Sequence, residues 1–134
     1  MSNLLDFSLE EKTDLMIEKL VEDVRGKNTF LSFGNLQLIL VETNKGFSRG
    51  GHYHKTKTNH SLLSGTIHLL QKNLFTGHEI GQTFTAPATI TIPEFCAHML
   101  TAVSDTKLIE AFPGGYEDTV FPEYRKIVER RMKK

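Results

Sequence analysis

Short runs of β-branched and aromatic residues, separated by turn-forming residues, occupy the sequence from residue 29 to residue 112. Their length and composition are typical of β-strands, and Ser64-Gly65, Thr76-Gly77 and Ser104-Asp105 are typical of the tight turns between strands. Many short strands at nearly even spacing predict an all-β fold, an antiparallel sandwich or barrel. The predicted strands are 29–33, 36–42, 50–55, 59–63, 66–71, 80–84, 89–92, 98–103 and 107–112.

A helix is predicted on each side of the strand region. Ser8 and Glu11 form a capping box, and Gly26 stands where a C-cap glycine belongs. They bracket an N-terminal amphipathic helix at about 8–25, whose apolar residues at helical spacing are Met16, Ile17, Leu20, Val21 and Val24. At the other end, Pro122 suits the first turn of a C-terminal helix at about 121–132, which has one face formed by Tyr124, Val128 and Met132.

Composition excludes several classes of protein. The chain has 134 residues, of which 39% are hydrophobic, so we expect a single domain over 1–134 with a packed core. Sixteen Lys and Arg balance sixteen Asp and Glu, so the chain lacks the net positive charge that is typical of proteins that bind nucleic acids or membrane surfaces. A single cysteine, the lack of a basic-then-apolar leader and the lack of a membrane-length apolar stretch predict a cytoplasmic protein.

Three of the six histidines lie within nine residues, at His52, His54 and His60. Side chains alternate across a strand, so His52 and His54 should project from one face, about 7 Å apart along the chain. Two imidazoles placed in this way can converge on one ion. His98 follows a proline turn at Pro93 further along the chain. His68 and His78 are isolated, and we interpret them as half-buried polar residues.

Gly46, His52, His54 and Gly65 resemble the first motif of the cupin superfamily: glycine, five residues, His-x-His, three or four residues, glutamate, six residues and glycine. The second cupin motif is matched by a proline and a histidine, while other residues stand at its three remaining places. The two matches are Pro93 and His98, and the three departures are Pro87, Phe95 and Ala102. The resemblance covers about residues 30 to 112. It implies a double-stranded β-helix, the RmlC-like jelly-roll barrel, with a site in its mouth.

The main departure from the first motif is Thr58, which stands where cupins have the glutamate. His60 would share a strand face with Thr58 and could supply the missing ligand. The resemblance then implies a divalent transition metal held by His52, His54, His98 and His60. Neutral imidazoles suit Zn, Fe, Mn, Ni or Cu and do not favour Mg or Ca.

A carboxylate could also come near the barrel mouth from elsewhere in the chain. Of the candidates Glu42, Glu79, Glu94 and Glu110, we predict a catalytic role for Glu110, which lies in a strand, with an outward-facing charge as the alternative. Cys96 could face the same cavity, although a small buried thiol is the simpler interpretation.

Two segments resemble metal-free cupin enzymes of nucleotide-sugar metabolism. The segment 92–98 with 104–106 is similar to dTDP-4-dehydrorhamnose 3,5-epimerases, and 49–55 resembles dTDP-sugar 3,4-ketoisomerases. This resemblance implies His52 as a base beside a keto group and Arg49 as the ligand of a nucleotide diphosphate. However, Ala111 stands where the epimerases have their acid tyrosine, and the ketoisomerases lack an equivalent of His98.

Three functions therefore stay open. The first is a metal-binding cupin enzyme that acts on a small oxygenated or sugar-like substrate, similar to the zinc-binding C-terminal domains of capsular-polysaccharide enzymes. The second is a metal-free isomerase or epimerase of a nucleotide-linked keto sugar. The third is a non-catalytic ligand-binding or dimerisation module. We also expect a homodimer, because cupin barrels commonly pair and the amphipathic helix at 8–24 offers a surface.

Overall fold

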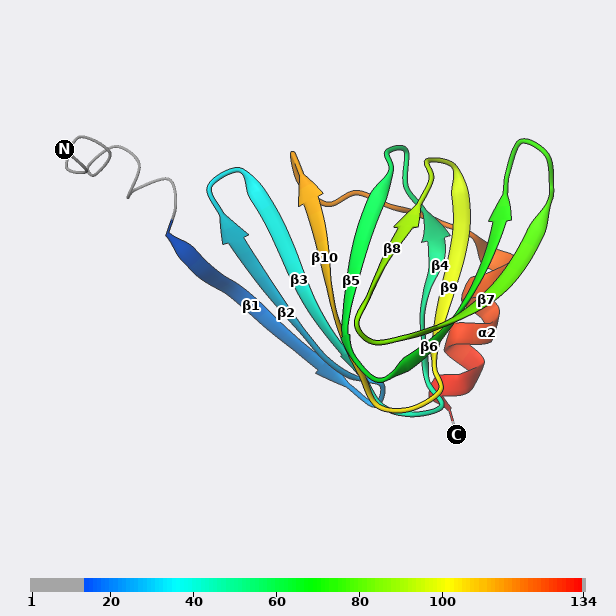
Figure 1. Cartoon of the computed structure of the whole chain (residues 1–134), viewed down its shortest axis with the longest axis horizontal. Coiled ribbons are helices and arrows are strands. Elements are labelled where there is room, and N and C mark those ends of the chain that lie inside the picture. The colour runs from blue at the N-terminus through cyan, green and yellow to red at the C-terminus, as the bar shows by residue number, and fades with distance from the viewer. Residues whose placement is uncertain (1–13, 134) are drawn as a thin grey trace.

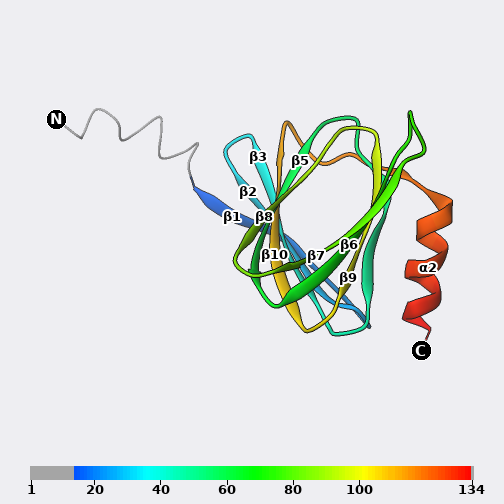
Figure 2. The same ribbon diagram turned by 45° about the vertical axis from the view of Figure 1, so that its right-hand side comes forward.

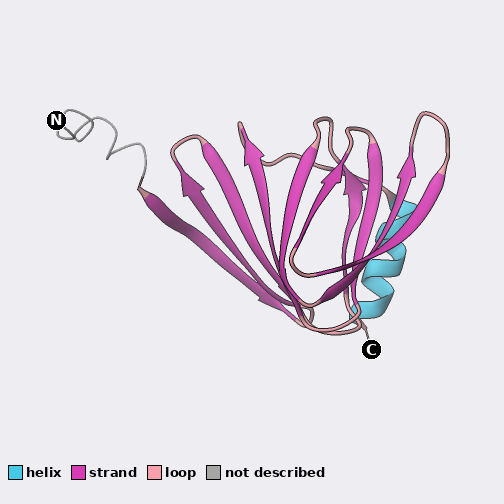
Figure 3. Cartoon of the chain, viewed as in Figure 1, coloured by secondary structure: helices cyan, strands magenta, loops and turns pink. Residues whose placement is uncertain are grey.

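The computed structural model describes residues 14–133 as two antiparallel β-sheets and one C-terminal helix (Figures 1 and 3). The strands are β1 (Leu15–Asp23), β2 (Gly26–Phe33), β3 (Leu36–Thr43), β4 (Ser48–Tyr53), β5 (Thr58–Ser64), β6 (Thr66–Asn73), β7 (Glu79–Thr85), β8 (Ala88–Ile92), β9 (Cys96–Ala102), β10 (Thr106–Pro113) and β11 (Thr119–Val120). The helix is α2 (Pro122–Met132). One sheet has the order β1-β2-β3-β10-β5-β8, and the other has the order β11-β4-β9-β6-β7. The predicted β-rich fold and C-terminal helix are confirmed.

The predicted N-terminal helix is wrong in the described part of the chain. Leu15–Asp23 forms β1, which pairs with β2, while Ser8 and Glu11 lie outside the described residues. The β1–β2 ladder shifts register between Ile17 and Lys19. A bulge inserts one extra residue and so interrupts the two-residue alternation of a strand. The apolar residues on either side of it then have a spacing similar to that of a helix. Gly26 begins β2, where an added Cβ would lie 2.2 Å from the carbonyl oxygen of Glu42.

The predicted barrel is not closed. Within residues 14–133 no ladder joins the two sheets, which face each other (Figure 2) and pack through the side chains of a shared core. Side-chain packing between two sheets needs no shared backbone hydrogen bonds, so it leaves free strand edges. Both sheets contribute to the buried core, which consists of Ile39, Val41, Leu62, Ile67, Leu69, Ile90, Ile92, Cys96, Leu100, Leu108 and Phe112.

Helix α2 covers the outer face of the five-stranded sheet. Tyr124 and Val128 are buried against Ala97 and Met99 of β9. Pro122 stands in the first turn, as predicted, and the backbone N–H of Phe121 donates to the carbonyl oxygen of Gly51. The start of the helix is thereby tied to the strand that carries the histidine motif. No helix within residues 14–133 has the length and hydropathy needed to cross a membrane.

Candidate functional site

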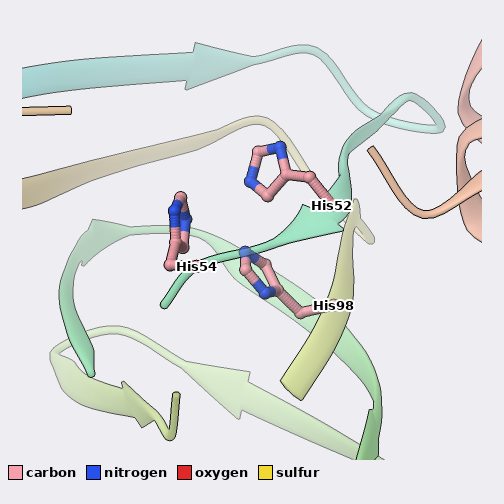
Figure 4. A group of neighbouring side chains, drawn as sticks. All are labelled: His52, His54 and His98. Carbon is pink, nitrogen blue, oxygen red and sulfur yellow. The ribbon is translucent and has the colours of Figure 1, made fainter. Parts of the chain in front are cut away.

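The structure brings His52, His54 and His98 together (Figure 4). β4 pairs with β9 so that His52 lies opposite His98, and His54 follows directly after β4. The ring centroid of His52 lies 4.8 Å from the centroids of both other rings. No two of the candidate ligand atoms are more than 4.8 Å apart. His54 and His98 are buried and His52 is half-buried. We refer to these three residues as the histidine triad.

In each ring of the triad, Nδ1 faces an oxygen that can only accept a hydrogen bond. Nδ1 of His54 bonds to the carbonyl oxygen of Glu117, and Nδ1 of His98 bonds to the carbonyl oxygen two residues before it, at 3.1 Å. Nδ1 of His52 lies 3.2 Å from a carboxylate oxygen of Asp118, without a well-aligned hydrogen bond. These neighbours place the proton on Nδ1, which leaves Nε2 of each ring as a lone-pair donor.

Burial keeps two rings of the triad uncharged. Burial, followed by the neighbouring His54, lowers the pKa of His52 to about 4. Burial, followed by His52 and His60, lowers the pKa of His98 well below its ordinary value. Both rings are therefore neutral at pH 7, which is the form that binds a metal. A base with a pKa near 4 is poorly matched to proton abstraction at neutral pH, so this value favours the ligand role for His52 over the base role.

His60 lies beside the triad but faces other partners. Its ring centroid is 6.0 Å from that of His98, and its side chain is fully buried. Nε2 lies 3.1 Å from Oγ1 of Thr58, and Nδ1 lies 3.1 Å from Oε2 of Glu110, which is paired with His60 across the β5–β10 ladder. Both ring nitrogens are thus close to other side chains, and the role of His60 as a fourth ligand stays a prediction.

Glu110 points inward, with 16% of its side chain exposed. Burial raises the pKa of its carboxyl group, but His60, His52 and His54 outweigh burial, and the net pKa lies below the ordinary value. Glu110 is therefore ionised at neutral pH. The other predicted carboxylates lie elsewhere: Glu42 is near Lys27, Glu79 accepts from Tyr124, and Glu94 is exposed.

A cavity of about 200 Å³, here called the central cavity, lies between the sheets and reaches the triad at His52. Its polar lining includes Arg49 and Glu110 from the strands and Arg125 from α2, and its apolar lining comes from β2, β3 and β9. The buried Arg49 donates from Nε to Oγ1 of Thr43 at 3.2 Å, and from Nη2 to the carbonyl oxygen of Glu42 at 3.0 Å. Burial lowers the pKa of Arg49 to about 10, so the guanidinium stays charged at neutral pH.

Sequence reasoning missed the contribution of the segment between β10 and β11. Tyr116 and Asp118 line the central cavity, and the carbonyl oxygen of Glu117 holds His54. The hydroxyl group of Tyr116 donates to Asp118, and burial, followed by this bond, raises the pKa of Tyr116 above its ordinary value. The glycine pair at 114–115 indicates a loop. Nothing in that signal tells which strand the loop will touch.

No protein-family model matches the sequence, and no curated protein matches it. Among solved structures, the fold is similar to that of the capsular polysaccharide assembling protein CapF from Staphylococcus aureus, with 18% identity, a TM-score of 0.59 and coverage of 80% of this chain and 34% of that one. It is also similar to a variant of oxalate decarboxylase from Bacillus subtilis, with 17% identity, a TM-score of 0.70 and coverage of 96% and 36%.

A third similar structure is hydroxypropylphosphonic acid epoxidase from S. wedmorenis, with 17% identity, a TM-score of 0.53 and coverage of 63% of this chain and 49% of that one. All three are cupin structures. This chain has the cupin fold. The chain spans about a third of the length of the CapF and oxalate decarboxylase chains.

The residues that resemble the two cupin motifs meet in the triad, since His52 and His54 match the first motif and His98 matches the second. Thr58, at the place of the cupin glutamate, is buried and contacts His60. A carboxylate nevertheless reaches this region, because Glu110 enters from the neighbouring strand β10.

Proposed function

We propose that this cupin binds one divalent transition metal through His52, His54 and His98 and acts on a small oxygenated substrate in the central cavity. The observation that carries the proposal is the arrangement of the three rings, each with Nδ1 against an acceptor. Nε2 of His98 is buried with no hydrogen-bond partner among the described residues. A buried acceptor without a partner is costly, and a bound cation would satisfy it.

The donor set suits a borderline metal such as Zn, Fe, Mn, Ni or Cu, because imidazole nitrogen is the ligand in every case. Metal–nitrogen bonds of about 2.0–2.1 Å separate two ligand nitrogens by at most ~4.2 Å. The triad, with ligand atoms up to 4.8 Å apart, therefore has to close slightly through side-chain rotation. Bound there, the ion would supply a Lewis acid for an oxygen atom of the substrate.

The other residues of the site bind and orient the substrate in this proposal. The ionised carboxylate of Glu110 lines the cavity and accepts a hydrogen bond from a hydroxyl group of the substrate, and His60 holds that carboxylate from behind. Arg49 binds a negatively charged group of the substrate. His60 could join the ligand set only by giving up its contact with Thr58 or with Glu110.

The decisive experiment is metal analysis of protein that has been purified without a nickel column. We expect about one equivalent of a transition metal per chain, or uptake to that level when the metal-free protein is titrated with Zn²⁺, Mn²⁺, Ni²⁺ and Fe²⁺. Less than roughly a tenth of an equivalent, together with no uptake on titration, would overturn the proposal.

The alternative is a metal-free isomerase or epimerase of a nucleotide-linked keto sugar. It is favoured by Arg49, a cation that shares the central cavity with His52. The lowered pKa of His52 counts against it, and so does a cavity of about 200 Å³, which is below the usual size for drug-sized ligands. This alternative predicts a thermal shift with millimolar dTDP or UDP. Failure to bind either nucleotide or metal would favour the third hypothesis, a non-catalytic module.

We further propose that the chain forms a homodimer through β1. Within residues 14–133 this strand pairs with β2 alone, so its other edge is free, and its apolar side chains are exposed: Leu15 by 60%, Ile17 by 72% and Leu20 by 53%. A free apolar edge invites pairing with another strand. A second copy presents the same edge, and a two-fold axis would cover both at once.

A further inference from the structure

The guanidinium of Arg49 is a buried charge without a carboxylate partner. Only 9% of the residue is exposed, and no carboxylate among the described residues lies within ion-pair distance of it. Its two hydrogen bonds go to neutral oxygens, the hydroxyl group of Thr43 and the carbonyl group of Glu42. Arginine has five N–H donors, so three remain unused within the described structure. A buried charge is costly unless it is paired, and an anionic ligand would pair it.

The charges around Arg49 also favour an anion. Arg125 lines the same cavity and donates from Nε to the carbonyl oxygen of Gly50, again a neutral acceptor. Two carboxylates line the cavity, but both have partners: Glu110 faces His60, and Asp118 accepts from Tyr116 and lies near His52. The unpaired charge in the central cavity is therefore positive.

The shape and lining of the cavity limit the anion to a small one. A volume of about 200 Å³ accommodates a short carbon chain, and Phe30, Ile39 and Val41 give it an apolar wall. The planar fork of a guanidinium matches a carboxylate, which it binds through two parallel hydrogen bonds. A phosphate dianion would be repelled more strongly by the two resident carboxylates. The side-chain oxygen of Asn28, buried in the same lining without a partner, could accept from a hydroxyl group.

We propose that the central cavity binds a short-chain hydroxy- or keto-carboxylic acid, with its carboxylate paired to Arg49 and its second oxygen directed toward His52. This inference rests on the proposed function for the chemistry at the triad. The carboxylate site itself is formed by protein side chains, so it should bind its ligand in the metal-free protein as well.

The test is calorimetric titration of the metal-free protein with pyruvate, lactate, glycolate, succinate and inorganic phosphate. We expect saturable binding of at least one of pyruvate, lactate and glycolate, weaker binding of phosphate, and a loss of affinity of about tenfold or more in Arg49→Gln. Arg49→Lys keeps the charge but lacks the planar fork of the guanidinium, so its affinity for the carboxylate should lie between those of the unaltered protein and Arg49→Gln. Arg130→Gln, which removes an exposed arginine from α2, is the control and should bind like the unaltered protein.

The outcomes separate the two proposals. This inference is overturned by equal affinity in Arg49→Gln, by binding of none of pyruvate, lactate and glycolate, or by phosphate binding tighter than all three, even if the metal content is one equivalent. Carboxylate binding without metal uptake overturns the proposed function and leaves this inference standing. If Arg49→Gln fails to fold by circular dichroism, Arg49→Lys decides: an undiminished affinity for the carboxylate would contradict bidentate recognition.

Discussion

The histidine triad depends on residues behind it as much as on the imidazoles themselves. Either nitrogen of an imidazole can carry the proton. A hydrogen-bond acceptor at Nδ1 holds the proton there, which leaves the lone pair of Nε2 free to bind a metal. For His54 and His52 those acceptors come from Glu117 and Asp118, which lie in the segment after β10. For His98 the acceptor is a carbonyl oxygen of its own strand. The site is thus preorganised by backbone and loop oxygens that no sequence motif contains.

Replacing His98 tests the triad most directly. His98→Gln keeps most of the volume at a fully buried position but lacks the imidazole donor, so we expect metal affinity to fall by about 100-fold or more. His78→Ala is the matched control, because His78 is exposed and lies outside the triad. Metal titration of both variants, followed by calorimetry or elemental analysis, gives the comparison. Equal metal binding by His98→Gln and the unaltered protein would contradict the triad as the metal site.

The lowered pKa of His52 predicts how the stability of the metal-free protein depends on pH. The unfolded chain takes up a proton near pH 6.5 and the folded chain only near pH 4, so the unfolded state binds more protons between these values. The free energy of unfolding should therefore decrease as the pH falls from about 6.5 to 4, by up to ~3 kcal/mol from this residue.

Urea denaturation of the metal-free protein at pH 7 and pH 4.5 measures this effect. His52→Gln removes the titrating group, so its stability should fall less over the same interval than that of the unaltered protein. His68→Gln, altered at a half-buried histidine of β6, serves as the control. An equal decrease in His52→Gln and the unaltered protein would show that His52 does not remain neutral in the folded state.

Among the elements, β1 shows where a periodic pattern misleads. Its apolar residues fit a helical period because the bulge between Ile17 and Lys19 interrupts the strand alternation. The choice between helix and strand was decided by the ladder that β2 and β3 offer, which is a tertiary contact. Strand β5, by contrast, was predicted correctly because its alternation is unbroken: Thr58, His60 and Leu62 are buried, and Asn59 and Ser61 are exposed.

The contact between β4 and α2 yields a prediction at Gly51. Its φ is 79°, and an added Cβ would lie 2.7 Å from Cα of Arg125, so Gly51→Ala must displace the helix or the strand that carries His52. Gly77 has nearly the same φ, 75°, but open space around it. Gly77→Ala should therefore lower the free energy of unfolding only by the backbone strain, about 1–2 kcal/mol. Gly51→Ala should lower it by a further ~1–3 kcal/mol, because the added methyl group overlaps α2.

Urea denaturation of both glycine variants isolates the steric contribution, because the two positions have nearly the same positive φ. Metal uptake by Gly51→Ala should also weaken if the displaced segment is β4. Equal destabilisation of the two variants would contradict the close contact between Gly51 of β4 and Arg125 of α2.

For the whole molecule, the free edge of β1 predicts the oligomeric state. We expect a dimer by size-exclusion chromatography with light scattering, and we expect Ile17→Lys with Leu20→Lys to shift it to a monomer, because charges on an edge strand prevent pairing. Ile80→Lys, at an exposed apolar position on β7, the edge of the other sheet, is the matched control and should remain dimeric. A monomeric unaltered protein would contradict the proposal, and so would a dimer that survives both β1 substitutions.

The sequence by itself determined the β-rich fold, the C-terminal helix and the residues of the triad. Strand alternation and motif spacing are local properties, and they suffice to place His52 and His54 on one face and His98 at the second motif. The tertiary structure decided the rest. It made β1 a strand, left the barrel open, turned Glu110 inward and brought Glu117 and Asp118 behind the imidazoles. Those outcomes depend on which strands become neighbours, and contacts between distant residues leave no periodic trace in a single sequence.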